Sequence, residues 1–236
     1  MGLKFDLVVI TSNEKINLAQ QILSLNLQKL PFIGSSFLIS EKTVSEKRCV
    51  SKKFCEVTFS EKLRCGISLT ESEYILIMLD DFVILEIHYV DMLIEVLDKI
   101  RPDYVRLTAK PVNGTPILTK YPFVVTTSTQ LYQLSSQPSL WRREVLSEIS
   151  DAEINPWDFE AFYHLRYRKI LGCTLGVTSD VLKCVEVVKK GRIKRSAAYQ
   201  LGLSYEGIPV MGFWQDLQSI VKVKLNRLLF AIRFYR

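Results

Sequence analysis

Two adjacent carboxylates, Asp80 and Asp81, directly follow the most hydrophobic strand candidate of the chain, Tyr74–Leu79 (YILIML). An uncompensated buried charge is very costly, so both side chains must face solvent, a cation or a ligand where this strand ends. In open α/β sheets, ligands bind outside the carboxyl ends of the strands. Carboxylates at that position can hold Mg²⁺ or Mn²⁺, which neutralises a diphosphate. The alternative is that the pair only caps the following turn.

The segment QPSLWRR (137–143) places one tryptophan beside two arginines. Trp141 could stack on a sugar ring, and Arg142 or Arg143 could bind phosphate. We expect these residues to follow Pro138 in a helix. The alternative is a structural helix with the tryptophan in the core and the charges in solvent.

The segment NPWDFE (155–160) follows with a second tryptophan and two acids. Trp157 could also contact a sugar. Asp158 or Glu160 could serve as a general base, provided that it lies within hydrogen-bond reach of an acceptor hydroxyl. The same structural alternative applies here.

The elements that must position these residues alternate along the first half of the chain. Such alternation predicts an α/β fold with a mainly parallel sheet covered by helices. The apolar runs and helical spacings predict strands over residues 6–11, 36–40, 54–59, 74–79 and 104–108, and helices over 16–30, 61–70 and 89–100. The second half is less regular: residues 110–129 read as a proline-containing loop, residues 131–134, 170–177 and 184–188 as strands, and residues 157–167 as a helix.

The bulk properties fit one globular domain inside a reducing compartment. The chain has 236 residues, of which 48% are hydrophobic and 24% charged. No signal peptide and no stretch of about 20 apolar residues is recognisable. The five cysteines have no CxxC spacing and there are two histidines, which argues against a zinc site. We therefore expect a cytoplasmic protein.

The last 24 residues, 213–236, predict a separate amphipathic helix. Its apolar residues recur at steps of three and four, namely Trp214, Leu217, Val221, Leu225, Leu228, Ile232 and Tyr235. Five basic residues accompany them, and residues 183–195 carry six more. Such a helix suits the surface of an anionic bilayer, which would make the protein peripheral on the inner face of the cell membrane. The alternative is a helix docked on the domain or on a partner.

Four segments together resemble the bacterial GT-A glycosyltransferases of the family-2-like group, which build cell-surface polysaccharides. They are LVVITSN (7–13), YILIMLDDFVIL (74–85), QPSLWRR and NPWDFE. The resemblance implies a single GT-A-like (Rossmann-like) domain over residues 1–212. It also implies transfer of a sugar from a nucleotide-sugar donor to a saccharide or lipid-linked saccharide acceptor, with inversion at the sugar.

The resemblance also implies roles for particular residues. Asp80 and Asp81 stand where the family has its D-x-D motif, which binds the donor and a divalent cation, Mn²⁺ or Mg²⁺. Three residues after the first strand, Thr11, Ser12 and Asn13, would lie near the nucleotide. Asp158 or Glu160 would be the catalytic base, and Trp141 and Trp157 would shape the acceptor or donor pocket. Two departures concern the motifs themselves: the acidic motif is DDF, and the base motif is Asp-Phe-Glu.

Two other classes of protein share some of these features. A nucleotidyltransferase could use the same acidic pair, but it normally has a glycine-rich phosphate loop after the first strand, where this chain has TSNEK. A non-enzymatic membrane-surface or nucleic-acid-binding protein could use the basic segments. RNA binders interleave basic residues with exposed aromatics on a sheet, whereas these basic segments follow the predicted sheet, so we expect no nucleic-acid partner.

Overall fold

The computed structural model describes residues 4–41, 45–46, 49–50, 58–109, 114–116, 122–126, 134–136, 138–150, 156, 160, 171–189, 191–212, 214–215, 217–218 and 221. Strands and helices alternate along the first half, as predicted. The elements there are β1 (Phe5–Ile10), η1 (Asn13–Lys15), α1 (Ile16–Lys29), β2 (Ile33–Ile39), β3 (Ser45–Glu46), β4 (Cys49–Val50), α2 (Phe59–Leu69), β5 (Tyr74–Leu79), β6 (Phe82–Ile87), α3 (Val90–Ile100) and β7 (Tyr104–Arg106).

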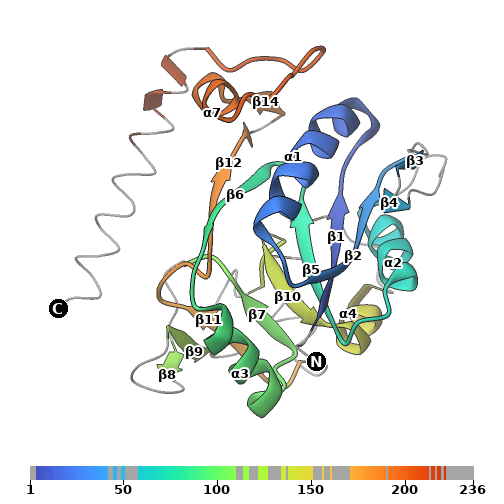
Figure 1. Ribbon diagram of the computed structural model, residues 1–236, viewed down its shortest axis with the longest axis vertical. Helices are drawn as coiled ribbons and strands as arrows, with labels where there is room; N and C mark the ends of the chain where they lie inside the picture. The colour runs from blue at the N-terminus through green and yellow to red at the C-terminus, as the bar shows by residue number, and fades with distance from the viewer. Residues whose placement is uncertain are drawn as a thin grey trace.

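A central sheet of eight strands has the order β2-β1-β5-β10-β7-β11-β9-β8 (Figure 1). Its remaining strands are β8 (Gly114–Pro116), β9 (Phe123–Thr126), β10 (Ser139–Arg142) and β11 (Thr174–Val177). All of them run in one direction except β9 and β10, so the predicted mainly parallel sheet is confirmed. The strands β2, β1 and β5 are adjacent and parallel, and their carboxyl ends therefore share one edge.

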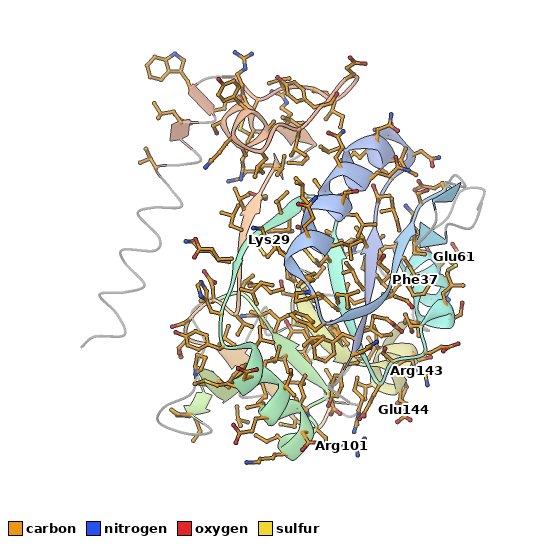
Figure 2. The ribbon with its side chains drawn as sticks, in the orientation of Figure 1. Lys29, Phe37, Glu61, Arg101, Arg143 and Glu144 are labelled. Carbon is orange, nitrogen blue, oxygen red and sulfur yellow. The ribbon has the colours of Figure 1, made fainter. Side chains whose placement is uncertain are left out.

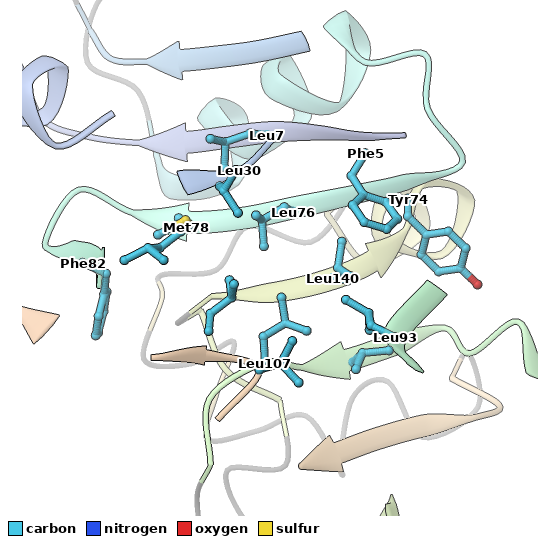
Figure 3. Packing of buried hydrophobic residues seen from close by; sticks show 14 of the residues in the cluster. Phe5, Leu7, Leu30, Tyr74, Leu76, Met78, Phe82, Leu93, Leu107 and Leu140 are labelled. Carbon is cyan, nitrogen blue, oxygen red and sulfur yellow. The ribbon is translucent and has the colours of Figure 1, made fainter. Parts of the chain in front are cut away.

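Helices cover both faces of this sheet. Alternate residues of each strand point to opposite faces. On one face, α1 and α3 pack on a cluster that includes Leu7, Leu76 and Leu140, which Figure 3 shows pointing from adjacent strands into the same core. On the other face, α2 and α4 (Arg143–Ser150) pack on a cluster that includes Val8 and Ile75. The sheet is thus the middle layer of three.

The helix α2 is fixed at its start and in its middle. A capping box joins Thr58 and Glu61, each side chain bonding the backbone of the other. Further along, the helix approaches β1 so closely at Gly66 that an added Cβ would lie 2.5 Å from Cγ1 of Val8. Only glycine allows this spacing without movement of the helix or the strand.

The C-terminal part of the described chain forms a smaller layer on the outer side of α1, at the top of Figure 1. It begins with β12 (Leu182–Glu186), which pairs with β6 in a separate two-stranded antiparallel sheet. The hairpin of β13 (Val188–Lys189) and β14 (Arg192–Ile193) and the helix α7 (Arg195–Leu201) follow. Leu18 and Ile22 of α1 pack against this layer, so α1 is covered on two sides.

Several predicted elements differ from the observed ones. Residues 139–142 form the strand β10, so the predicted helix around Trp141 is wrong, and α4 begins only at Arg143. Phe59 begins α2 and does not end a strand. Glu160 is helical, as predicted, and Pro156, where we expected a turn, is helical as well. Residues 51–57, 131–133 and 157–159 lie outside the described residues. Among the helices that the structure describes, none combines the length and the apolar character that crossing a membrane requires.

Candidate functional site

The acidic pair forms the turn between β5 of the central sheet and β6 of the small sheet. This turn is held from two directions. Asn26 of α1 donates from Nδ2 to the carbonyl of Phe82 (3.0 Å) and accepts from the amide of Ile84 at Oδ1 (2.8 Å). The amide of Val187 donates to the carbonyl of Asp81 (2.7 Å). Asp80 and Asp81 are therefore placed at the carboxyl end of β5, where the sequence predicted them.

Asp80 is already engaged by protein groups. Its Oδ2 accepts a hydrogen bond of 2.6 Å from the hydroxyl of Thr11, which follows β1. Its Oδ1 lies 3.8 Å from Nζ of Lys15, in η1. The register of β1 and β5 explains the first contact, because Ile10 lies opposite Leu79 and the next residues of both strands meet. Asp80 thus joins two strand ends and holds one ammonium group.

Asp81 is less well compensated than its neighbour. Its Oδ1 is buried and has no hydrogen-bond partner within the described part of the chain. Burial, then the charges of Asp80 and Glu186, raise the pKa of Asp81 to about 7, and Lys15 opposes this only in part. Burial disfavours the negative form of such a carboxylate, and a nearby positive charge favours it. An under-compensated carboxylate at a strand end is therefore suited to bind a cation.

A second cluster of polar side chains lies beside the acidic pair, at the ends of β1 and β2. Lys62 of α2 donates from Nζ to the carbonyl of Thr11 (3.0 Å) and forms an ion pair with Glu41, just after β2. The amide of Asn13 donates to the other oxygen of Glu41 (2.8 Å). Although burial raises the pKa of Glu41, these hydrogen bonds, above all that from Lys62, hold it below its usual value. The amide oxygen of Asn13 is buried without a partner among the residues described.

These contacts bring the three residues predicted near a nucleotide to the edge that holds the acidic pair. Thr11 binds Asp80, Ser12 lies between it and η1, and Asn13 binds Glu41. Glu41, Lys15 and Lys62 were not predicted to belong to this site. Glu41 follows a predicted strand, just as Asp80 does, so its position could have indicated it. The two lysines gave no such signal, because nothing local distinguishes them from solvated lysines.

Glu160 lies at the same edge of the sheet. Its Oε1 accepts from the amide of Ser136 (2.6 Å), from the hydroxyl of Ser136 (2.7 Å) and from the hydroxyl of Ser135 (3.1 Å). These serines precede β10, which runs antiparallel to β5 with Ser139 opposite Ile77. The residues before Ser139 therefore extend toward the end of β5. Trp157 and Asp158 lie outside the described residues.

Trp141, Arg142 and Arg143 lie at the opposite edge. This corrects the expectations that Trp141 stacks on a sugar and that Arg142 or Arg143 binds phosphate. Trp141 is 1% exposed, and its ring packs 4.6 Å from the ring of Tyr104. Arg142 lies opposite Tyr74, the first residue of β5, and pairs with Asp103. Arg143 donates to the carbonyl of Thr70 (3.2 Å), and Figure 2 shows it near the lower end of the sheet, whereas β1 points upward (Figure 1). These side chains support the fold.

The acidic pair fits a divalent cation that a ligand helps to bind. No group of three histidine, cysteine, aspartate or glutamate side chains with metal-binding geometry occurs within the described ranges. Mg²⁺ is usually held by one or two carboxylates together with substrate phosphates and water. Asp81, with its unpartnered oxygen, and the adjacent Asp80 match that arrangement, and a diphosphate would supply the further oxygens.

Comparison with known proteins gives matches of structure. No family model and no curated protein sequence matches the chain. Among solved structures, TarS from S. aureus, a GT-A-like glycosyltransferase, is similar over 81% of this chain in its 1–349 form with UDP-GlcNAc, with a TM-score of 0.56 and 12% identity. A second structure of TarS 1–349 from S. aureus is similar over 84% of this chain, with a TM-score of 0.53 and 12% identity.

This chain has a GT-A-like fold. The likeness at 12% identity concerns the fold alone. The chain spans 60% of the TarS 1–349 structure with UDP-GlcNAc and 63% of the other. A third structure, of TarS from S. aureus, is similar over 80% of this chain and 37% of its own length, with a TM-score of 0.52 and 12% identity.

Proposed function

We propose that this protein is a nucleotide-sugar-dependent glycosyltransferase. The observation that carries the proposal is the unpartnered, buried oxygen of Asp81, at the carboxyl end of β5, in a fold shared with a protein that binds UDP-GlcNAc. We assign the nucleotide to the neighbouring edge formed by Thr11, Ser12 and Asn13. The diphosphate of the donor would then lie against Asp80 and Asp81.

The charges around the turn support binding of a diphosphate together with a cation. Asp80 and Asp81 would hold Mn²⁺ or Mg²⁺. When bound, such an ion neutralises the negative charge that develops on the leaving diphosphate. Lys15 is the nearby basic side chain, since its ammonium lies 3.8 Å from Asp80. Its positive charge would also stabilise the negative charge that develops on the leaving diphosphate, which is electrostatic catalysis.

The transfer itself would be a single displacement. Glu160 or Asp158 removes the proton of an acceptor hydroxyl, and the hydroxyl oxygen forms a bond to the anomeric carbon. The bond between that carbon and the diphosphate oxygen breaks, and its electron pair leaves with the nucleoside diphosphate. One displacement inverts the configuration of the anomeric carbon.

The described geometry supports a role for Glu160 in this step. Three hydrogen bonds converge on its Oε1, so its carboxylate is fixed at the edge that holds the acidic pair. A base must be held in place to be effective, because small displacements of a reacting group are costly. We propose a saccharide or lipid-linked saccharide as the acceptor, in the synthesis of a cell-surface polysaccharide.

Thermal stabilisation by donor nucleotides tests the proposal. A ligand that binds only the folded form raises the melting temperature. UDP-, GDP-, CMP- and dTDP-sugars are compared with and without Mn²⁺, and nucleoside triphosphates serve as the arm for a nucleotidyltransferase. We expect a shift with one class of nucleotide sugar that Mn²⁺ enlarges. No shift with any nucleotide sugar would overturn the proposal.

A pair of matched variants assigns the effect to the acidic turn. Asp80→Asn with Asp81→Asn should abolish the shift. The control is Asp91→Asn with Asp98→Asn, which removes two exposed carboxylates from α3. The control should keep the shift of the parent protein. An unchanged shift in the Asp80/Asp81 variant would remove the turn from the binding site.

A further inference from the structure

The last described residues of the chain expose apolar side chains on one side of a helix. Trp214, Leu217 and Val221 are helical, and their spacing of three and four places them on one face. Trp214 is 72% exposed, Val221 56% and Leu217 40%. A helix docked on the domain would bury this face. Each of these three side chains is instead at least 40% exposed.

The layer next to this helix is basic and carries an exposed aromatic residue. Arg192 and Arg195 are exposed, and Nη1 of Arg192 lies 3.5 Å from Oε1 of Gln215, which places β14 beside the helix. Tyr199, one turn after Arg195 on α7, is 89% exposed. We call these six residues the C-terminal patch: Arg192, Arg195, Tyr199, Trp214, Leu217 and Val221.

We propose that the C-terminal patch binds the surface of an anionic phospholipid bilayer. Tryptophan and tyrosine are favoured at the level of the lipid headgroups, and leucine and valine gain by entering the acyl region. Arginines beside them attract anionic headgroups, each contributing about 1 kcal/mol. The sequence continues this composition, because residues 222–236 contain five basic and no acidic residues.

The combination of charge and apolar exposure favours a bilayer over other partners. A second copy of the chain would bring its own arginines against these, so like charges would meet. A nucleic acid would be attracted by the arginines but gains little from exposed leucine and valine, since its contacts are chiefly with phosphates, base edges and base faces. An anionic bilayer matches both halves of the patch.

Vesicle co-sedimentation of the full chain, without any nucleotide, tests this proposal. Phosphatidylcholine vesicles are compared with vesicles that also contain phosphatidylglycerol, at low and high salt. We expect binding to the anionic vesicles that weakens as salt rises, because salt screens the arginines. Equal binding to both kinds of vesicle, or none to either, would overturn the proposal.

Two variants separate the contribution of the arginines to vesicle binding from that of the apolar side chains, and each has a matched control. Arg192→Gln with Arg195→Gln should weaken binding about thirtyfold, which corresponds to about 1 kcal/mol for each basic residue. Its control, Lys99→Gln with Arg101→Gln, removes two exposed charges from the end of α3, where Figure 2 shows Arg101 at the bottom of the molecule. Trp214→Ser with Leu217→Ser and Val221→Ser should weaken binding at least tenfold, whereas Val125→Ser on β9, which is 40% exposed, should not.

The same variants distinguish the remaining partners. If the triple serine variant converts a dimer to a monomer in the absence of vesicles, the patch is an interface between copies and the membrane proposal is wrong. If labelled RNA or DNA competes fully with vesicles, the patch is a nucleic-acid site. Retention of the nucleotide-sugar shift in all of these variants would show that they are folded.

Discussion

The hydroxyl of Thr11 donates a hydrogen bond of 2.6 Å to Oδ2 of Asp80, which ties the end of β1 to the end of β5. Both residues are buried. Replacing Thr11 by valine keeps the shape but leaves a carboxylate oxygen without its donor, which costs about 1 to 3 kcal/mol. We expect lower stability in urea and a weaker thermal shift with the donor.

A second buried threonine provides the control for that variant. Thr126 shares a hydrogen bond of 2.6 Å with Thr174, between β9 and β11. Thr126→Val should lower stability but leave the donor shift unchanged. If both variants affect the donor equally, the bond from Thr11 has no particular role in the site.

The raised pKa of Asp81 predicts in which direction the stability of the protein changes with pH. Its pKa is raised from 3.8 to about 7 in the folded protein. Between these values the folded state binds more protons than the unfolded state, so the free energy of unfolding falls as pH rises through about 7. Asn resembles the protonated carboxyl, so Asp81→Asn should exceed the parent in stability at pH 8, by about 1 to 3 kcal/mol.

The difference in stability between Asp81→Asn and the parent should shrink at acid pH. Near pH 4 the parent carboxyl is protonated in the folded state, and the advantage of Asp81→Asn should vanish. Urea unfolding at pH 4, 6 and 8 measures this. A constant difference across the range would show that Asp81 does not titrate as described. Mn²⁺ should stabilise the parent more at pH 8 than at pH 6, and should stabilise Asp81→Asn little.

Lys62 should be important for stability as well as for the site. Lys62→Met removes the ion pair with Glu41 and a hydrogen bond to the carbonyl of Thr11. We expect a loss of about 2 kcal/mol at pH 7. The pKa of Glu41 is lowered in the folded protein, so this stabilisation exists above its usual pKa and is lost as pH falls through its folded value.

The loss caused by Lys62→Met should therefore be smaller at pH 3 than at pH 7. The exposed pair Lys99 and Glu95 on α3 gives the comparison, because Lys99→Met should cost less than about 1 kcal/mol. Equal losses at both pH values would contradict the role of the Glu41 pair.

Gly66 should tolerate no side chain. A Cβ there would lie 2.5 Å from Cγ1 of Val8, so Gly66→Ala must push α2 away from β1. Overpacking of this kind costs about 1 to 3 kcal/mol. Because Val8→Ala removes the obstructing atom, Gly66→Ala should cost less in a Val8→Ala background than in the parent. Additive losses in the double variant, measured by urea unfolding, would refute this explanation.

The parts of the fold that the sequence predicted well are those with long local patterns. The apolar strand Tyr74–Leu79 and the helix spacing that begins at Ile16 are both found. The strand β10 was missed because four residues show no clear period, and its pairing with β5 and β7 comes from distant parts of the chain. The tryptophan of β10 appeared available for a ligand only because its arginine neighbours suggested an exposed segment.

The candidate site was predictable to a similar degree. The acidic pair could be placed from its position after an apolar strand. Its partners could not, since Lys15 reaches it across 65 residues and Lys62 reaches Glu41 across 21. Contacts of that kind depend on the order of the strands and on the approach of α2 at Gly66, and neither has a local signature.

The helix α1 has consequences for how this chain can vary. Ala19 and Leu23 face the sheet, Leu18 and Ile22 face the layer that carries the C-terminal patch, and Asn26 holds the strand that leaves the acidic turn. Substitution at any of these five buried positions should therefore disturb the sheet, the outer layer or the acidic turn. In a saturation mutagenesis survey, α1 should tolerate fewer replacements than α3, whose buried residues pack against one cluster only. Compensating changes should appear in pairs on both sides of α1.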